Sequence, residues 1–367
     1  MTRSFSLKQK VGVIIHDLPR FLWAMRPSGL LGGDASPWIY FRNRNERLIR
    51  EEGKKGVLCD WQWTSSLHAA RVFPILGVWL MKRVLQEWPI AFKDLPVGGS
   101  DYQGPVELSF IIGHRGTARL PHLLTTLRSL FGQSQVGCEY LVVEQDAETK
   151  IKDHLPPGVK HIWIKPPVPD MPYSRSWAFN VGARAAKGRL LVLHDNDICV
   201  PAHYARELLK LFSQGYQAMR LQRFIFYLDP PSTEAITRAH RIPETLGLHS
   251  VLQNGQGPTI AVDREAYFQL GGHDEAFVGW GGEDNEFFQR CQTLSFYPYM
   301  YLPLVHLYHE PQQGKGNHRG RETAALLRAR SALPIAQRVA ELAARNFGNP
   351  QQLDPPYPSK VVLENLA

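Results

Sequence analysis

Long apolar segments and clustered cysteines are both missing from this sequence. The longest apolar run, Val72–Met81, has about ten residues and is interrupted by a proline and a glycine, whereas a membrane-spanning helix needs about 20. The four cysteines, Cys59, Cys138, Cys199 and Cys291, form no Cys-x-x-Cys pair, so neither a zinc site nor a disulfide framework is indicated. The N-terminus has no apolar core followed by small residues. We therefore expect a cytoplasmic protein without a secretory signal or a transmembrane helix.

Two common nucleotide-binding motifs are missing as well. No Gly-x-x-x-x-Gly-Lys-Ser/Thr loop occurs, and no Gly-x-Gly-x-x-Gly follows a predicted strand, so P-loop ATPases and dinucleotide-dependent dehydrogenases lose their main support. Zinc-finger spacing and RNA-recognition signatures are also absent, so we expect no nucleic-acid partner. The chain is nevertheless basic, with 42 Lys+Arg against 34 Asp+Glu and a net charge of +8. Phosphates and anionic membrane surfaces suit such a charge.

Residues 1–104 are predicted to form a basic, Trp-rich extension. From Met1 to Asp60 there are 11 Lys/Arg and 6 Asp/Glu, which is +5 of the total charge. Four tryptophans follow in the helical pattern of residues 60–93: Trp61, Trp63, Trp79 and Trp88. The simpler interpretation is a helix packed on the main domain. The alternative is a peripheral contact with the anionic inner face of a membrane, where Trp and Lys/Arg occur together.

The main domain is predicted at residues 105–311, where short apolar strands alternate with longer helices. Strands are predicted at 108–112, 140–144, 161–164, 190–194 and 297–302, and helices at 120–131 and 175–186. This alternation predicts an α/β fold with a mostly parallel sheet, helices on both faces, and ligands beyond the carboxyl ends of the strands. Residues 312–367 are predicted to form a mobile basic loop, containing Lys315 and Arg319, and a C-terminal helix.

An Asp-x-Asp pair follows the predicted strand at 190–194. Because side chains alternate along a strand, Asp195 and Asp197 are predicted to point to one side. Carboxylate oxygens in this arrangement suit Mg²⁺ or Mn²⁺ that keeps positions open for phosphate. Most Asp-x-Asp pairs are turns or solvated caps, so the prediction depends on the position at the end of an apolar strand. His306 and His309 are three residues apart and could bind the same metal, although such pairs are more often ordinary surface or core histidines.

A segment rich in glycine and acids begins at Gly279. Its glycines allow close approach to a ligand, Trp280 offers a face for sugar stacking, and Glu283 and Asp284 lie in the first turn of a predicted helix. A carboxylate here could act as a general base. A capped helix start is the structural alternative, because negative charge is favourable at a helix N-terminus without any chemistry.

Taken in order, these segments resemble the nucleotide-sugar glycosyltransferases of the GT-A fold. The resemblance covers residues 107–311 and is closest to the family-2-like, inverting β-1,4-galactosyltransferase type, with Trp280-Gly-Gly-Glu-Asp284 as its most specific match. It implies a Rossmann-like GT-A domain, a UDP-sugar donor, and Mn²⁺ or Mg²⁺ as the cofactor. The acceptor stays open among saccharides, lipid-linked saccharides and proteins, and residues 229–250 and the N-terminal arm are expected to bind it.

The resemblance also implies roles for individual residues. Asp284 corresponds to the catalytic base, and Glu283 would orient the acceptor. The expected metal ligands are Asp195, Asp197, His306 and His309. The expected donor-binding residues are Arg115, Glu144, Arg175, Asp195, Trp280, Gly281 and Gly282.

Two departures from the animal galactosyltransferases are visible. His306 stands where those enzymes carry Met, and Gly255 stands where they place a bulky tyrosine, which leaves room for an N-acetyl group. Two other functions are weighed beside inverting transfer. One is a retaining transferase of the polypeptide N-acetylgalactosaminyl type, and the other is a sugar-nucleotide-binding module that has lost its chemistry.

Overall fold

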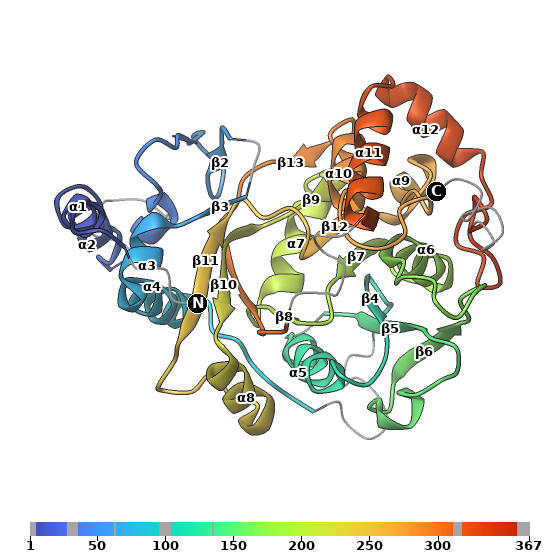
Figure 1. Cartoon of the computed structure of the whole chain (residues 1–367), viewed down its shortest axis with the longest axis horizontal. Helices are drawn as coiled ribbons and strands as arrows, with labels where there is room; N and C mark the ends of the chain where they lie inside the picture. The colour runs from blue at the N-terminus through green and yellow to red at the C-terminus, as the bar shows by residue number, and fades with distance from the viewer. Residues whose placement is uncertain are drawn as a thin grey trace.

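Two β-sheets lie at the centre of the chain and are surrounded by helices (Figure 1). The computed structural model describes residues 5–27, 36–61, 64–94, 104–133, 136–310 and 318–357, with the side chains of residues 318–321 left out. The seven-stranded sheet has the order β13-β9-β12-β7-β4-β5-β6, and the five-stranded sheet has the order β3-β11-β10-β14-β8. A small two-stranded sheet pairs β1 (Leu48–Ile49) with β2 (Leu58–Cys59).

The seven-stranded sheet is mostly parallel, as predicted. Its parallel strands are β4 (Leu108–His114), β5 (Cys138–Gln145), β6 (Val159–Ile164) and β7 (Leu190–His194). The antiparallel β12 (Thr259–Asp263) joins them to two short strands, β9 (Ala218–Met219) and β13 (Phe296–Tyr297). The prediction of one strand over 297–302 is wrong, because the chain crosses between the two sheets here and the next strand, β14 (Leu302–His306), belongs to the other sheet.

Helices cover both faces of this sheet because successive strand residues point to opposite sides. Phe110 and Ile112 of β4 lie in one apolar cluster with Leu123 of α5 (Leu120–Phe131). Ile111, between them, lies in a second cluster with Phe179 of α6 (Arg175–Ala185). Both helices and the four parallel strands occur where the sequence predicts them. The α/β class, with helices on both faces, is therefore confirmed.

The five-stranded sheet was not predicted as a unit. It combines β10 (Gln222–Leu228) and β11 (Leu248–Gln253) with β14, β8 (Ile198–Cys199) and β3 (Ser65–Ser66). The further helices of the main domain and the C-terminal segment include α7 (Tyr204–Ser213), α8 (Pro230–Ala239), α9 (Arg264–Gln269), α10 (Glu283–Cys291) and α12 (Ile335–Ala343). Helix α11 (His318–Ser331) lies against α10.

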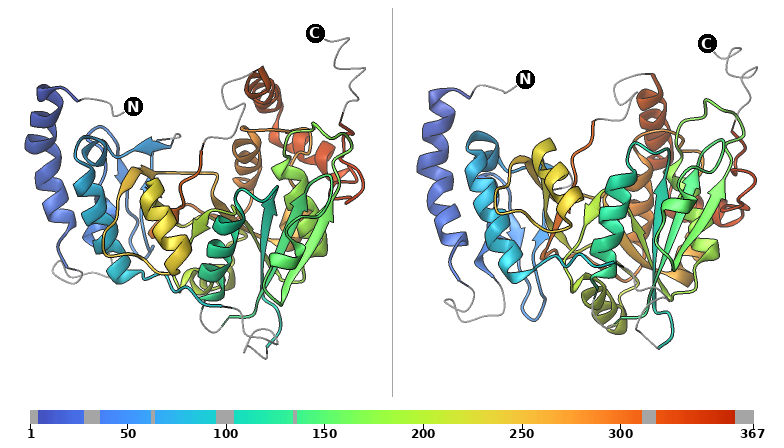
Figure 2. Two further views of the ribbon diagram at one scale, coloured as in Figure 1. Left: turned by 60° about the horizontal axis from the view of Figure 1, so that its bottom comes forward. Right: turned by 90° about the horizontal axis from the view of Figure 1, so that it is seen from below.

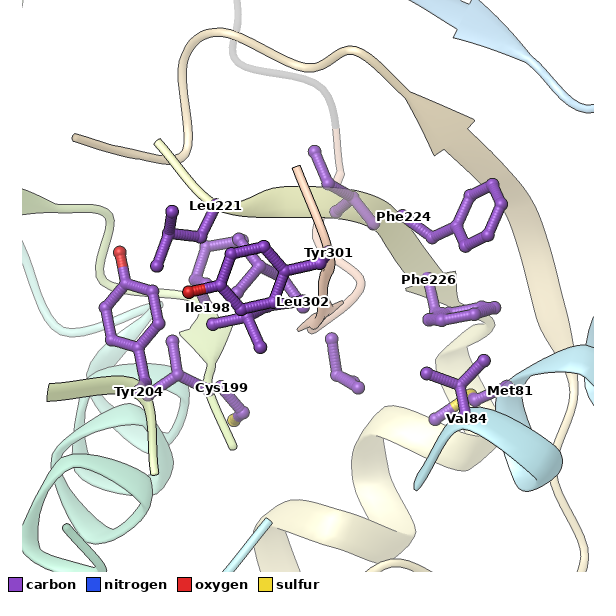
Figure 3. Packing of buried hydrophobic residues seen from close by; sticks show 14 of the residues in the cluster. Met81, Val84, Ile198, Cys199, Tyr204, Leu221, Phe224, Phe226, Tyr301 and Leu302 are labelled. Carbon is purple, nitrogen blue, oxygen red and sulfur yellow. The ribbon is translucent and has the colours of Figure 1, made fainter. Parts of the chain in front are cut away.

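The N-terminal extension packs on the five-stranded sheet. It contains α1 (Leu7–Gly12), a π-helical stretch (Val13–Asp17), α2 (Leu18–Ala24), a 3-10 turn (Pro37–Tyr40), α3 (His68–Val72) and α4 (Pro74–Glu87). Met81 and Val84 of α4 face Phe226 of β10 in a shared core (Figure 3). Arg223, also on β10, is fully buried and donates to the backbone carbonyls of Ile39 and Phe41. The interpretation of residues 60–93 as a helix packed on the main domain is confirmed for α4.

None of the helices in the described part of the chain combines the length and apolar character needed to cross a bilayer. Lys315 of the predicted basic loop lies outside the described residues. Arg319 falls in the first turn of α11, among the positions whose side chains are not described.

Candidate active site

A cavity of about 670 Å³ opens where the two sheets meet. Nine of the predicted site residues line it: Arg115, Arg175, Asp195, Asp197, Trp280, Glu283, Asp284, His306 and His309. Gly281 and Gly282 line an adjoining hollow of about 240 Å³, which shares Trp280, Glu283 and Asp284 with the larger cavity. The structure thus brings together side chains that are almost 200 positions apart in the sequence.

Three of these residues form a group that could hold a metal ion. The ligand atoms of Asp197, His306 and His309 all lie within 4.8 Å of one another. The Nδ1 atoms of His306 and His309 each lie 2.7 Å from a backbone carbonyl oxygen, which leaves Nε2 of each ring facing Asp197 at 3.7 and 3.2 Å. Asp197 Oδ1 is buried and accepts no hydrogen bond from any described residue. One carboxylate and two imidazoles with such outer contacts fit a divalent transition-metal ion.

Strand pairing explains why these ligands meet. β14 runs antiparallel to β8, with His306 opposite Ile198 and Val305 opposite Cys199. The Leu307 amide then donates to the carbonyl of Asp197 at 2.9 Å. The ladder fixes the Asp197 backbone directly beside His306, whose ring also stacks on Tyr227 with centroids 4.1 Å apart. The edge of the five-stranded sheet thus holds Asp197 and His306 together, and His309 follows three residues after the end of β14.

Asp195 takes a different place from the one the sequence predicts. β7 ends at His194, so residues 195–197 form a turn and the alternation of strand side chains no longer applies. Asp195 Oδ1 accepts from Arg175 Nε at 2.8 Å and does not join the group formed by Asp197, His306 and His309. In this structure Asp195 is therefore held by Arg175, while the group of converging ligand atoms contains Asp197.

Arg175 lies at the centre of the carboxylate cluster. Besides Asp195, its guanidinium pairs with Asp284 and lies 3.7 Å from a carboxylate oxygen of Glu283. It also donates to the backbone carbonyl of Gly257. Burial alone would lower the pKa of Arg175, but the three carboxylates raise it above its usual value. Arg175 is thus a fixed cation that holds three acidic side chains in place.

Burial and mutual repulsion shift the pKa values of the acidic side chains. Burial raises the pKa of Glu283 to about 7, and Asp284 adds to this effect while Arg175 opposes it. Burial also raises the pKa of Asp195 to about 7, against the effect of Arg175. Asp197 shows the opposite result: burial would raise its pKa, but His306, His309 and a nearby arginine together hold it below the usual range. Asp197 is therefore ionised and ready to bind a cation.

The glycine segment before α10 requires its glycines. Gly281 and Gly282 have φ angles of +98° and +95°, where L-residues with a side chain are strained. A Cβ on Gly282 would lie 2.9 Å from a ring carbon of Phe277 and 3.2 Å from the carbonyl oxygen of Thr323. This sharp turn aims the first turn of α10, and with it Glu283 and Asp284, at the cavity.

Glu144 lies outside both cavities. Its side chain is fully buried and accepts hydrogen bonds from Thr149 Oγ1 and from the amides of Lys150 and Ile151, and it contacts His161 at 2.8 Å. These contacts fix the loop after β5. The structure gives Glu144 a role in holding this loop and does not bring its side chain to the predicted nucleotide site.

Arg115 lines the cavity but is also tied to the backbone. Its Nε donates to the carbonyl of Gln145 at 2.9 Å and one Nη donates to the carbonyl of Met171 at 2.8 Å. On α6, Asn180 is used to hold the fold together. Asn180 is buried and bonds to His273, Glu275 and Tyr267.

The sequence analysis missed several residues that line the cavity. Arg119, at the start of α5, lies 3.4 Å from Asp197 and 3.0 Å from Nδ1 of His309. The sequence pattern could have indicated Arg119, because it is a basic residue in the same strand-to-helix junction as Arg115. Tyr227 and His249 come from the five-stranded sheet, and Thr64 comes from the N-terminal extension just before β3. No local pattern marks these three, since only the second sheet brings them to the site.

Comparison with known protein families identifies a matching segment that includes part of this site. Residues 237–309 match the family model described as the N-terminal domain of galactosyltransferase. This segment includes Trp280, both candidate catalytic acids and both metal-site histidines. The match bears out the expected enzyme class, a glycosyltransferase. No curated protein sequence matches the chain significantly.

Three solved structures show a more distant likeness. The catalytic domain of Drosophila β1,4-galactosyltransferase 7 with xylobiose is 15% identical, with a TM-score of 0.38 over 59% of this chain and 79% of that chain. The mannosyltransferase PcManGT from Pyrobaculum calidifontis with GDP-Man and Mn²⁺ is 15% identical, with a TM-score of 0.43 over 74% and 76%. GalNAc-T7 with UDP, GalNAc and Mn²⁺ is 17% identical, with a TM-score of 0.41 over 67% and 56%.

Proposed function

We propose that this protein is an inverting, metal-dependent glycosyltransferase that moves a hexose or N-acetylhexosamine from a UDP-sugar to an acceptor hydroxyl. One observation carries the proposal: a metal-binding group and a pair of carboxylates at a helix start line the same cavity. The family match to residues 237–309 supports it, because the matched segment contains the carboxylate pair and the two histidines of the metal-binding group. Neither set alone would point to sugar transfer.

The metal-binding group would hold the diphosphate end of the donor. Asp197, His306 and His309 would bind Mn²⁺ or Mg²⁺, and such an ion, when bound, offsets the negative charge that grows on the departing diphosphate. Arg119 and Arg115 line the same cavity, and their guanidinium groups suit phosphate oxygens. The site is thus cationic where the leaving group would lie.

Asp284 would act as the general base. As the acceptor oxygen bonds to the anomeric carbon, the bond from that carbon to the diphosphate oxygen breaks, UDP leaves with the bonding electrons, and the hydroxyl proton moves to a carboxylate oxygen of Asp284. Attack opposite the leaving group inverts the anomeric centre. Arg175 pairs with Asp284 and Asp195 and so fixes where this carboxylate lies, and Glu283 would orient the acceptor.

Two glycines lie in the cavity wall near the proposed base. A Cβ at Gly255 would meet the Ile225 side chain, and a Cβ at Gly257 would lie 2.6 Å from Asp284 Oδ2. Both positions therefore need glycine so that the chain can pack closely against Ile225 and Asp284. Trp280, which is 47% exposed, would offer its ring to the sugar of a saccharide, lipid-linked or protein acceptor.

Thermal unfolding with nucleotides tests the donor site. We expect UDP to raise the melting temperature in the presence of Mn²⁺ or Mg²⁺ but not with EDTA, because a ligand that binds only the folded state stabilises it by mass action. GDP, CDP and TDP serve as controls for the base. Asp197→Asn should abolish the metal-dependent shift, whereas Asp284→Asn should keep it. If no nucleotide stabilises the protein with any metal, the donor-site assignment is refuted.

Turnover separates the alternative functions. The wild type and Asp284→Asn are assayed with a panel of UDP-sugars, and only the wild type should transfer sugar. NMR of the product should show an inverted anomeric configuration. A retained configuration would favour the polypeptide N-acetylgalactosaminyl type of transferase. Nucleotide binding without transfer across the donor and acceptor panels would favour a binding module.

A further inference from the structure

Exposed apolar side chains are concentrated at the N-terminal end of the molecule. Nine large apolar residues in the described part of the chain are strongly exposed, and seven of them belong to the N-terminal extension. Five come from α1, the π-helical stretch and α2: Leu7, Val11, Ile14, Ile15 and Leu22, which are 43% to 78% exposed. We call these five residues the apolar stripe.

Helical spacing places the stripe on one side. Relative to Leu7 its members lie at positions +4, +7, +8 and +15, which recur on one face of a helix. The other side of the same helical segment carries Val13, Phe21 and Ala24, which are buried against the rest of the extension. Figure 1 and Figure 2 show α1 and α2 as the outermost helices at this end of the molecule. The stripe therefore faces outward and is not part of the core.

Helix α4, next to α2, carries two further exposed apolar side chains. Ile75 and Trp79 are 50% and 47% exposed, and the Trp79 ring lies 6.4 Å from the ring of Phe21 on the buried side of α2. Tryptophan beside aliphatic side chains is typical of protein surfaces at the boundary between lipid headgroups and acyl chains.

The charges around the stripe indicate which partner it fits. Residues 5–27 contain two lysines, Lys8 and Lys10, and two arginines, Arg20 and Arg26, against one acid, Asp17, which is buried. A further arginine lies at the start of the segment, where Arg71 is 6.0 Å from the ring of Phe5, whereas Arg83 near its other end is largely buried and pairs with Glu87. An anionic surface would be attracted, whereas a second copy of this chain would bring like charges together.

We propose that the apolar stripe docks this protein onto the surface of an anionic phospholipid bilayer. The apolar side chains enter the headgroup boundary while the flanking lysines and arginines contact lipid phosphates. This is the arrangement of a peripheral, in-plane helix and requires no segment that spans the bilayer. The proposal does not depend on the proposed sugar transfer.

Vesicle flotation of the full chain tests the proposal. The protein should float with phosphatidylglycerol-containing vesicles at low salt, less at high salt, and weakly with pure phosphatidylcholine. Ile15→Glu should weaken vesicle binding by about tenfold or more, because a charge replaces an apolar group that must leave water. Gln9→Glu is the matched control: it adds the same charge to the same helix away from the stripe, and glutamate can keep the capping box with Ser6.

Each outcome has a definite meaning. Loss of binding in Ile15→Glu but not in Gln9→Glu supports insertion of the stripe, provided that circular dichroism and the melting temperature show both variants folded. Equal loss in both variants would reduce the effect to charge alone and overturn insertion. Absence of flotation of the wild type at low salt would also overturn the proposal. So would light scattering that shows a wild-type dimer which Ile15→Glu dissociates, if the wild type does not bind vesicles. No sugar transfer is measured, so failure here leaves the proposed function intact.

Discussion

Replacing Arg175 with methionine should destabilise the protein in a pH-dependent way. Arg175 lies 2.8 Å from Asp195 and 3.7 Å from Glu283, and it also pairs with Asp284. Removing one partner of a buried ion pair costs about 3–5 kcal/mol. Because the side chains of Asp195 and Asp284 are 31% and 29% exposed, solvent screens part of the interaction, and we expect a loss near the lower end, about 3 kcal/mol at pH 8.

The sign of the pH effect follows from the three carboxylates. Without the guanidinium their mutual repulsion raises their pKa values, so the folded variant takes up protons more readily than the unfolded chain. Stability of the variant relative to the wild type therefore falls as pH rises, and the loss at pH 6 should be smaller than at pH 8. Urea unfolding at the two pH values measures both quantities on the metal-free protein.

Arg184 provides the control for this experiment. It lies on the same helix, and its Nε donates to the backbone carbonyl of Phe347 at 3.0 Å. Arg184→Met should cost about 1 kcal/mol with no comparable pH dependence. If Arg175→Met and Arg184→Met lose the same stability at both pH values, the role of Arg175 as the counter-ion of the cluster is refuted.

Three further predictions follow from single residues. The pKa of Glu283 is about 7 against an ordinary 4.5, so the folded state binds the proton more tightly than the unfolded chain. The free energy of unfolding should therefore fall as pH rises from about 4.5 to about 7. Glu283→Gln should flatten this slope in a pH series of urea titrations, and an unchanged slope would contradict the assignment. Gly282→Ala should lower the free energy of unfolding in urea by about 1–3 kcal/mol, and by more than Gly53→Ala does. Both glycines have positive φ, but a Cβ at Gly282 meets Phe277, whereas a Cβ at Gly53 meets nothing within 4 Å. Equal losses would mean that only the backbone conformation matters and that the contact with Phe277 does not. Met81→Ala should cost about 2–5 kcal/mol in a single cooperative transition, because Met81 is fully buried in the core shared with the five-stranded sheet; a separate early transition would show that the extension unfolds independently.

The seven-stranded sheet could be predicted because its signals are local. Buried parallel strands appear as continuous apolar runs, and 190–194 coincides with β7. The five-stranded sheet could not be predicted in the same way. Its strands are 2 to 7 residues long and join segments as distant as Ser65 and Gln253, so pairing across the whole chain, and not a local pattern, decides their structure.

The candidate site likewise contains residues that local sequence patterns predict and residues that they do not. Residue types at strand and helix ends predicted Asp197, Glu283 and Asp284, all of which line the cavity. The assignment of Asp195 to the metal group depended on extending strand alternation into a turn. The assignment of Glu144 depended on resemblance alone, whereas its side chain is used to fix a loop.

The pairing of β8 with β14 has a consequence for the order in which this protein matures. Asp197 and His306 are 109 positions apart in the numbering, yet the ladder between these strands holds them side by side. During synthesis, a chain that has emerged only as far as α10 carries the aspartate but neither histidine, so it lacks the ligand set. Binding of an ion by all three side chains therefore requires that β14 has been made and has docked beside β8. Metal uptake by a stalled nascent chain would report how much of the second sheet has formed.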